Sequence, residues 1–334
     1  MQVNDRVYGK AEVNDPVLLR LIDSKHVQRL KGISQTGACK FIDPELSFSR
    51  YEHSMGVMIL LKNLNAGIEE QIAGLLHDVP HTAFSHVVDF VFNNKKHDYH
   101  EQHYERIIKE SEIPKILDEF NIPLDGILDN SRFTLLEQDS PALCADRIDY
   151  SLRAMAIDHR FDYNAQEIAK HFIVNDNRIV MNCGTAAKKF AEYFIRIDET
   201  QFSNMEGVAC YEVMANAIRR GLKEKIITEK ELFENDDYIW KKLKDSNDPS
   251  IMENLRLLHP GFEVREVQNI PLEQYDFCSS GKLRYVDPAF VDKDGIITTV
   301  SKAFPDFNKT IKAHRKHAES DHYIKIISRH IRSL

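Results

Sequence analysis

The chain has 334 residues, of which 43% are hydrophobic and 29% charged, and its formal net charge is −8. This length and composition are typical of a folded, water-soluble chain with a sizeable core, and the acidic balance argues against an extended surface for nucleic acid or anionic lipid. No stretch approaches the roughly 18 consecutive apolar residues of a membrane helix. The N-terminus lacks the hydrophobic region of a signal peptide and the five cysteines are scattered, so we expect a cytoplasmic protein without a disulfide framework.

The first part of the chain is predicted to be mainly helical. About ten N-terminal residues alternate weakly and predict an edge strand or an arm. Asp15 followed by Pro16 is typical of a helix start, and the apolar residues after it cover about half of a helical wheel, so one helix is expected to about residue 31. Residues 33–50 break the periodicity and predict a loop. A helix from about Tyr51 to Asn65 follows, with His53 in its first turns.

Residues 68–86 contain an adjacent histidine and aspartate behind an apolar helix. Helical spacing of the apolar residues between Ile68 and Leu76 indicates a buried helix that delivers His77 and Asp78 at its end. Burying a carboxylate beside an imidazole is unfavourable unless something compensates them, and a divalent cation suits this pair best. The stretch therefore predicts half of a metal site.

The segment 99–158 continues as helix, with a turn near residues 123–126 and a capped restart at Ser140-Pro141. A helical wheel of the restarted helix separates an apolar side from a polar side. The apolar side holds Leu143, Cys144, Ile148, Leu152 and Met155, whereas Asp146, Asp149, Tyr150 and Arg153 fall on the other. We expect the first side to pack and the second to carry chemistry.

The remaining chain predicts a mainly α protein with a smaller α+β part at its C-terminal end. Residues 171–182 predict a small β-hairpin, residues 186–227 return to helix, and two further helices are expected before residue 260. Beyond residue 262, strand signals at 264–267, 283–286 and 296–300 precede a terminal helix at 311–320. We therefore divide the chain into a helical core, 1–261, and an α+β region, 262–334, that could serve as a lid or an oligomerisation element.

Four residues supply a complete set of metal ligands. His53, His77, Asp78 and Asp146 give two imidazoles and two carboxylates on three helices. This mixed set suits Mn, Fe, Mg, Zn, Ni or Co and does not select among them. Four protein ligands on a six-coordinate ion leave positions for water and for a phosphate oxygen.

Four sequence motifs resemble the HD-domain phosphohydrolase superfamily, and within it the branch with the deoxynucleoside triphosphate triphosphohydrolases of the SAM-and-HD-domain type. They are R-Y-E-H-S-M-G at 50–56, I-A-G-L-L-H-D-V-P-H-T-A-F-S-H at 72–86, Y-H-E-Q at 99–102 and A-D-R-I-D-Y at 145–150. The resemblance covers roughly the first half of the chain. It implies the HD-type helical core, a divalent metal bound by the four residues above, and a homo-oligomer.

The resemblance also implies roles for other residues. His100 would protonate the leaving oxygen, with Glu101 beside it and His81 as a further catalytic histidine near the metal. The substrate would be bound by Arg50 and His86 at its phosphates, by Tyr150 and Arg153 in the pocket, by Gln35 and Thr36 at the sugar, and by Arg196, with Lys188 and Lys189 on the same helix, at the outer phosphates. For His81, His86 and His100 a purely structural hydrogen-bonding role is the alternative.

Two departures from the family pattern leave the substrate open. Pro80 stands where the family often has glycine, and Gln35-Thr36-Gly37 stands where an apolar residue between Gln and Gly helps to exclude a 2′-hydroxyl. The leading hypothesis is a dNTP triphosphohydrolase that uses a metal-activated hydroxide and releases deoxynucleoside and tripolyphosphate. The alternatives are an HD phosphoesterase for a nucleoside monophosphate, a cyclic or signalling nucleotide or a short oligonucleotide, and a catalytically silent nucleotide-binding regulator.

Overall fold

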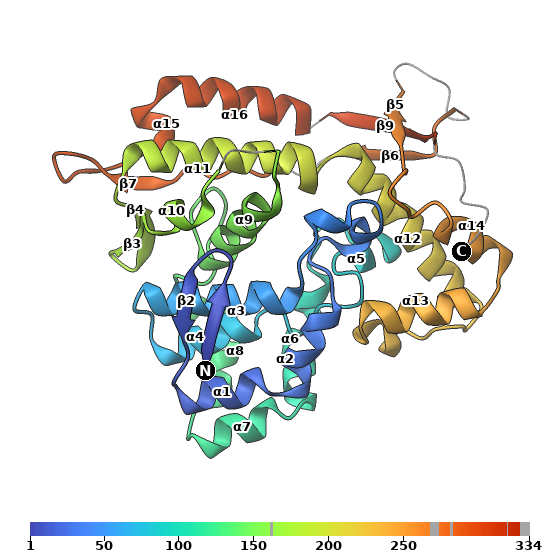
Figure 1. Cartoon of the computed structure of the whole chain (residues 1–334), viewed down its shortest axis with the longest axis horizontal. Coiled ribbons are helices and arrows are strands. Elements are labelled where there is room, and N and C mark those ends of the chain that lie inside the picture. Colours follow the sequence, from blue (N-terminus) through green and yellow to red (C-terminus); the bar gives the residue numbers. More distant parts are fainter. Residues whose placement is uncertain (161–162, 268–273, 281–282, 319, 328–334) are drawn as a thin grey trace.

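The protein is mainly α-helical, as predicted (Figure 1). The computed structural model describes residues 1–160, 163–267, 274–280, 283–318 and 320–327. Helices dominate the first two-thirds of the chain, and short strands are concentrated near its C-terminal end. No helix among these residues is long and apolar enough to cross a membrane.

The N-terminal residues form an antiparallel hairpin of β1 (Gln2–Asp5) and β2 (Gly9–Glu12), where an edge strand or arm was predicted. Helix α1 (Pro16–Ile22) begins at the predicted cap, but the expected continuous helix to residue 31 is wrong. The chain turns at Ser24, whose hydroxyl donates to the carbonyl of Leu21 and accepts from the amide of Val27. Serine satisfies backbone groups in this way at helix ends, so a separate helix α2 (Lys25–Arg29) starts there.

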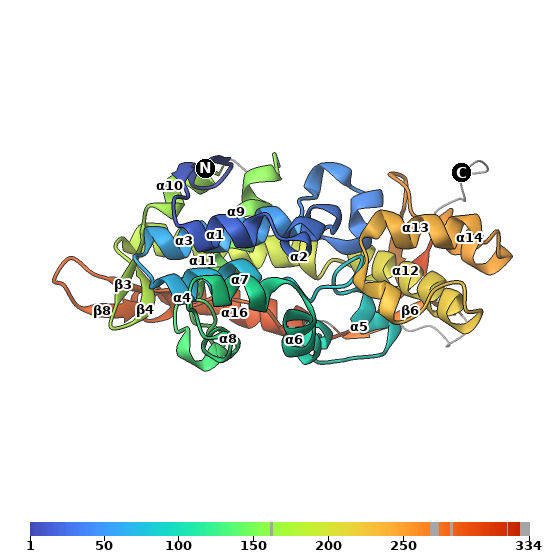
Figure 2. The same ribbon diagram turned by 90° about the horizontal axis from the view of Figure 1, so that it is seen from below.

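Helices α3 (Arg50–Asn63) and α4 (Ile68–Leu76) confirm the predicted pair that carries His53 and His77. A capping box fixes the start of α3, because the Ser49 hydroxyl accepts from the Glu52 amide while the Glu52 carboxylate accepts from the Ser49 amide. The next helices are α5 (Val87–Val91), α6 (Tyr99–Glu110), α7 (Ile113–Glu119) and α8 (Leu124–Leu128). Figure 2 shows α3 and α4 toward one end of the molecule and α12 to α14 at the other.

Helix α9 (Ala145–Ile157) begins later than the predicted restart at Ser140-Pro141. The amide of Ala142 donates to the carbonyl of Asp139 and closes a turn there. The amide of Ala145 then donates to the carbonyl of Leu135, which is outside the helix. The first turn of α9 therefore forms only after this anchor, and it carries Asp146.

The following elements are α10 (Ala165–Ala169), the predicted hairpin of β3 (Phe172–Asn175) and β4 (Arg178–Met181), and α11 (Gly184–Ile197). A single π-helical turn (Asp198–Phe202) joins α11 to α12 (Met205–Lys223). Helices α13 (Asp236–Asp245) and α14 (Pro249–Leu255) are the two further helices that the sequence predicted.

The C-terminal region contains β5 (Val264–Glu266), β6 (Phe277–Ser280), β7 (Ala289–Val291), β8 (Ile297–Thr299), α15 (Val300–Ala303), α16 (Pro305–Ala318) and β9 (Asp321–Ile326). Strand β9 was not predicted, and the predicted strand at 283–286 is wrong. That segment pairs with no strand among the described residues. Its backbone instead lies against the turn before α9, because the Ser140 hydroxyl donates to the carbonyl of Tyr285 and the Asp287 amide donates to the carbonyl of Pro141.

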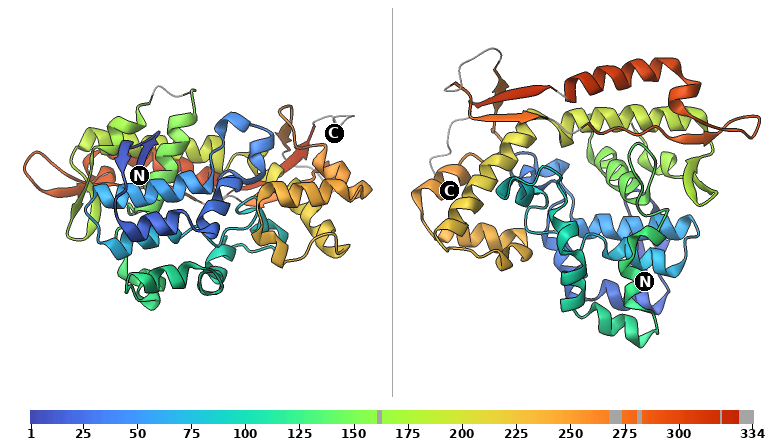
Figure 3. Two further views of the ribbon diagram at one scale, coloured as in Figure 1. Left: turned by 60° about the horizontal axis from the view of Figure 1, so that its bottom comes forward. Right: turned by 180° about the vertical axis from the view of Figure 1, so that it is seen from behind.

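The C-terminal region packs closely on the rest of the chain. Strand β7 pairs in parallel with β4, so one sheet has the order β3-β4-β7-β8 and includes residues from both sides of position 262. Phe290 and Phe307 belong to the same buried cluster as residues of α9 and α11. Helix α16 runs beside α11 in the views from front and back (Figures 1 and 3). The division at 261/262 remains a prediction from the change in sequence pattern.

Candidate active site

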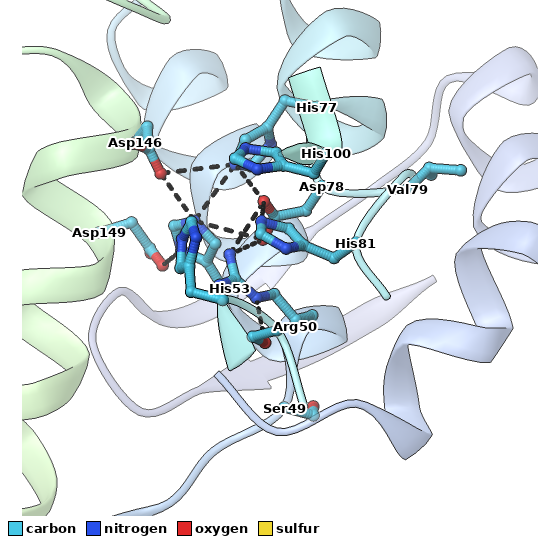
Figure 4. A network of polar contacts seen from close by, with 12 residues as sticks. Ser49, Arg50, His53, His77, Asp78, Val79, His81, His100, Asp146 and Asp149 are labelled. Atoms are coloured by element: carbon cyan, nitrogen blue, oxygen red, sulfur yellow. Dashed lines mark hydrogen bonds and ion pairs between the residues drawn. The ribbon is translucent and has the colours of Figure 1, made fainter. Parts of the chain in front are cut away.

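Three side chains from separate helices converge on one point (Figure 4). Nε2 of His53 lies 2.8 Å from Oδ1 of Asp146 and 3.2 Å from Nε2 of His77. Nε2 of His77 lies 3.4 Å from Oδ1 of Asp146. His53 is completely buried, while the other two retain some exposure. The predicted set H…HD…D is therefore brought together by α3, the end of α4 and the start of α9.

Asp78 completes this set from the buried side. Its Oδ2 lies 3.7 Å from Nε2 of His53 and its Oδ1 lies 3.5 Å from Nε2 of His77. Nη1 of Arg50 donates to both carboxylate oxygens, at 3.0 and 2.8 Å, and Nε2 of His81 lies 3.1 Å from Oδ1. Asp78 is consequently held in place by charge on one side and faces the two imidazoles on the other.

The tautomers of the two histidines fit a metal. Nδ1 of His77 lies 2.8 Å from the carbonyl of Gly74, and Nδ1 of His53 lies 2.8 Å from Oδ2 of Asp149. Both partners accept, so each Nδ1 carries a proton and each Nε2 faces the carboxylates, where its lone pair would bind a metal ion once any proton on it is displaced. Two imidazole nitrogens and two carboxylates thus converge, and a divalent cation is a group that stabilises such a set of ligand atoms.

The electrostatics of the ligand residues agree with this fit. Burial alone would lower the pKa of His53, but hydrogen bonds to Asp146 and Asp149 raise it to about 9. Burial raises the pKa of Asp146, whereas contacts with His53 and His77 lower it overall, well below its ordinary value. In the metal-free chain a proton therefore occupies part of the space that a cation would take, and metal and proton compete.

A buried series of charged residues contacts His53 at Nδ1, the ring nitrogen that does not face the candidate metal position. Oδ2 of Asp149 accepts a hydrogen bond from Nδ1 of His53 and another from Nε of Arg153 at 2.7 Å. Nη2 of Arg153 reaches Oδ2 of Asp5 in the N-terminal hairpin at 2.6 Å. A Cβ added to Gly56 would lie 1.9 Å from Nη2 of Arg153, so only glycine leaves room for this ion pair.

This arrangement changes the role expected for Arg153. We predicted a pocket-lining residue, but the side chain is 1% exposed and its guanidinium is shared by two buried carboxylates. We therefore assign Arg153 to holding His53 through Asp149 rather than to substrate contact. Asp5 had no sequence signal, because it lies 148 positions from its partner.

Three further histidines form a second group beside the metal ligands. The rings of His81 and His100 stack with centroids 3.9 Å apart, and His86 approaches them edge-on at 5.0 and 5.3 Å. Burial is the main cause that lowers the pKa of each of the three, and the charge of Arg50 lowers all three further. The pKa of His100 falls to about 3. These rings are therefore neutral at pH 7, and Nδ1 of His100 is buried without a hydrogen-bond partner among the described residues.

The Gln35-Thr36-Gly37 loop packs against Phe84, in the segment between His81 and His86. Gly37 has a φ of +57°, and a Cβ there would lie 2.7 Å from the carbonyl oxygen of Phe84 and 2.8 Å from the hydroxyl of Tyr211. Oε1 of Gln35 is buried with no partner in the described parts of the chain, and Oγ1 of Thr36 lies 3.2 Å from Oγ of Ser34. Tyr211, on α12, was not predicted, because no motif marks it.

The other predicted residues have different positions. The centroid of the Tyr150 ring lies 6.3 Å from that of His53 and 5.5 Å from that of Phe202, so Tyr150 lies beside the candidate site. Nε2 of His100 is 4.0 Å from Oε1 of Glu101, whose side chain is 72% exposed. Arg196 is exposed in the last turn of α11.

The two predicted lysines of α11 contact aromatic rings, and one of them also pairs with a glutamate. Lys188 lies over the ring of Phe304 and 3.6 Å from Oε1 of Glu192. Lys189 lies over the rings of Tyr163 and Tyr193. The site and its scaffold together define a candidate metal centre on a mainly helical fold.

Comparison with known proteins gives the family. The HD domain family model matches residues 50–154. The chain is 41% identical to the uncharacterised protein YdhJ of Bacillus subtilis over 98% of this chain and 99% of YdhJ, and 30% identical to the metal-dependent phosphohydrolase cns2 of Cordyceps militaris over 86% of this chain and 84% of cns2. The chain therefore belongs to the HD-domain metal-dependent phosphohydrolases, which confirms the resemblance to that superfamily.

Other similarities are local or concern only the fold. The deoxynucleoside triphosphate triphosphohydrolase SAMHD1 of Gallus gallus is 32% identical over 36% of this chain and 24% of its own length. A crystal structure of a phosphohydrolase from Bacteroides thetaiotaomicron superposes with a TM-score of 0.74 and 19% identity, covering 98% of this chain and 100% of that one. A hypothetical protein from Aquifex aeolicus gives a TM-score of 0.70 and 20% identity, covering 98% and 96%.

Proposed function

We propose that the protein hydrolyses a nucleotide at a phosphoester bond, and that its substrate is a dNTP cleaved at the α-phosphate to deoxynucleoside and tripolyphosphate. The observation that carries the proposal is the convergence of His53, His77, Asp78 and Asp146 beside Arg50 and three neutral histidines. The local similarity to SAMHD1 and the Gln35-Thr36-Gly37 loop at the same site support a nucleotide as the substrate.

When bound by these four residues, a divalent cation supplies a Lewis acid for a phosphoryl oxygen and lowers the pKa of a water molecule. Arg50 keeps Asp78 ionised and oriented, and Asp149 keeps His53 in the ligand tautomer. His100 is neutral at pH 7 in the free protein, since burial lowers its pKa to about 3. A phosphate anion beside the ring favours its protonated form, which can then donate to the leaving oxygen.

His81 and His86 hold the position of His100. His81 stacks on the ring of His100, and Nδ1 of His86 lies 2.9 Å from Oδ2 of Asp89, which fixes its ring. Oε1 of Gln35 is buried without a hydrogen-bond partner in the described parts of the chain, and a sugar hydroxyl would satisfy it. Tyr150 supplies an aromatic wall next to His53.

A second candidate is an HD phosphoesterase for a nucleotide with fewer phosphates, such as a nucleoside monophosphate or a cyclic nucleotide. Two observations favour it. Lys188 and Lys189 of α11 lie over the rings of Phe304 and Tyr163, which leaves less positive charge for a tetra-anionic tail. The hydroxyl of Thr36 is 3.2 Å from Ser34, so the loop presents polar groups where an apolar residue would reject a ribose hydroxyl.

A substrate panel separates the two candidates. The purified chain is incubated with ribo- and deoxynucleoside mono- and triphosphates and cyclic nucleotides, with Mn, Mg, Fe, Co, Ni or Zn in turn, and the products are resolved by anion-exchange chromatography. Tripolyphosphate from dNTPs alone supports the first candidate. Orthophosphate from monophosphates, or opening of cyclic nucleotides, supports the second. Nucleotide binding without turnover under every metal contradicts both and favours the silent regulator.

A further inference from the structure

Arg284 of the C-terminal region lies near the candidate active site. Nη1 of Arg284 donates to the hydroxyl of Ser203 at 2.8 Å and lies 3.5 Å from Oδ1 of Asp198. Ser203 directly follows the π-helical turn that ends at Phe202, and the ring of Phe202 packs against Tyr150. The guanidinium is therefore positioned beside the aromatic wall of the site.

The charge of Arg284 acts on three groups of the site that lie on different segments. Burial is the main cause of the lowered pKa of His86, and Arg284 lowers it further. Burial likewise dominates the raised pKa of Tyr150 on α9 and of Tyr211 on α12, and Arg284 opposes both shifts. Arg284 therefore lies near enough to these three side chains for its charge to act on each of them.

The backbone and side chain of Arg284 are held by a buried cluster. Asp198 is completely buried and His314 is 2% exposed. Nε2 of His314 lies 2.9 Å from the carbonyl oxygen of Arg284 and 3.3 Å from Oδ2 of Asp198, and the hydroxyl of Ser203 donates to Oδ1 of Asp198 at 2.8 Å. Helix α16, which carries His314, thus fixes the position of Arg284 relative to the end of α11.

Only one nitrogen of the Arg284 guanidinium is used by this cluster. Nε and Nη2 have no hydrogen-bond partner among the described residues, and the side chain retains 29% exposure. Arg50, by contrast, gives Nη1 to Asp78 and Nε to Ser85 and is 4% exposed. A planar guanidinium that presents the N–H groups of Nε and Nη2 suits bidentate binding of two oxygens of a phosphate.

We propose that Arg284 binds a phosphate group of the substrate, so that the C-terminal region completes the binding site of the HD core. Asp198, Ser203 and His314 are positioning residues that hold this arginine. The inference rests on the proposed function, since it takes the substrate to be a phosphorylated nucleotide. Arg284 would thus supply positive charge for the substrate phosphates, whereas Lys188 and Lys189 lie over aromatic rings.

Binding of inorganic tripolyphosphate, measured by isothermal titration calorimetry, tests the assignment without any turnover. The full chain is used metal-free, because tripolyphosphate chelates divalent cations, and the wild type is compared with R284A, R284K and the control R20A. Arg20 is an exposed arginine that pairs with Glu119 on the far helices α1 and α7. Circular dichroism spectra and metal content of the reloaded variants verify that each is folded.

We expect R284A to bind tripolyphosphate at least tenfold more weakly than the wild type, R284K to lie between the two because a lysine lacks the two-pronged geometry, and R20A to match the wild type. With the nucleotide that the panel identifies, R284A should raise KM by a similar factor and change kcat by less than threefold. Equal affinity of R284A and the wild type, or no binding by the wild type, would overturn the assignment. If no nucleotide is hydrolysed, the proposed function fails while the calorimetric comparison still decides the role of Arg284.

Discussion

Removal of the Asp149 carboxylate should weaken both the fold and the metal site. Its Oδ2 accepts two hydrogen bonds inside the protein, from His53 at 2.8 Å and from Arg153 at 2.7 Å. A hydrogen bond to a charged group contributes about 1.5–3 kcal/mol, so Asp149→Ala should lower the free energy of unfolding of the metal-free protein by about 3–5 kcal/mol, in line with the loss of one partner of a buried ion pair. Asp149→Asn keeps an acceptor oxygen and removes only the charge, so its effect should be about half as large.

Urea unfolding of the metal-free chain measures these changes, with Asp118→Asn on the exposed side of α7 as the control. The same variants are titrated with Mn²⁺, and Asp149→Ala should bind it about 10- to 100-fold more weakly because His53 loses its orienting partner, whereas Asp149→Asn should lose less because it keeps an acceptor. If Asp149→Ala unfolds within 0.5 kcal/mol of the wild type, the buried charge chain does not stabilise the protein. If metal affinity is unchanged in both variants, Asp149 does not orient His53.

Three further predictions concern the same centre. Asp78→Ala should abolish metal binding and turnover together, and retention of full activity after metal removal would contradict the metal-dependent mechanism. Gly56→Ala places a Cβ 1.9 Å from Nη2 of Arg153, so it should lower the free energy of unfolding by about 3 kcal/mol or more, measured in urea. Metal affinity should rise about tenfold per pH unit from pH 7 toward 9, because the cation displaces the proton of His53, whose pKa is about 9; a flat affinity in this range would refute that assignment.

The raised pKa of His53 also determines how the metal-free protein responds to pH. The folded-state pKa of about 9 exceeds the unfolded value of about 6.5, so the stabilisation is fully present below pH 6.5 and is lost as the pH rises through 9. Urea unfolding of the metal-free chain should therefore show declining stability from pH 7 to pH 9.5. Saturating metal should reduce this decline, since the cation then replaces the proton.

The sequence singled out the residues that converge at the candidate site because they carry local signals. Apolar periodicity located the helix that ends before His77 and Asp78, and the polar face of a later helix located Asp146. The same periodicity misplaced helix ends. It could not show that Ser24 would bond backbone groups and divide a helix, or that the amide of Ala145 would be anchored to Leu135 outside α9.

Asp5 and Arg284, which the sequence did not reveal, are charges whose partners are distant in the chain. Asp5 and Arg153 neutralise each other across 148 positions, and Arg284 approaches Ser203 across 81. An exposed aspartate or arginine looks the same in a sequence as a buried one, because only the fold brings the compensating charge to it. Both long-range contacts act on the HD centre from outside its motifs, one from the N-terminal hairpin and one from the C-terminal region. Family motifs alone therefore locate the chemistry but leave out part of what holds His53 in place and, if Arg284 binds phosphate, part of what selects the substrate.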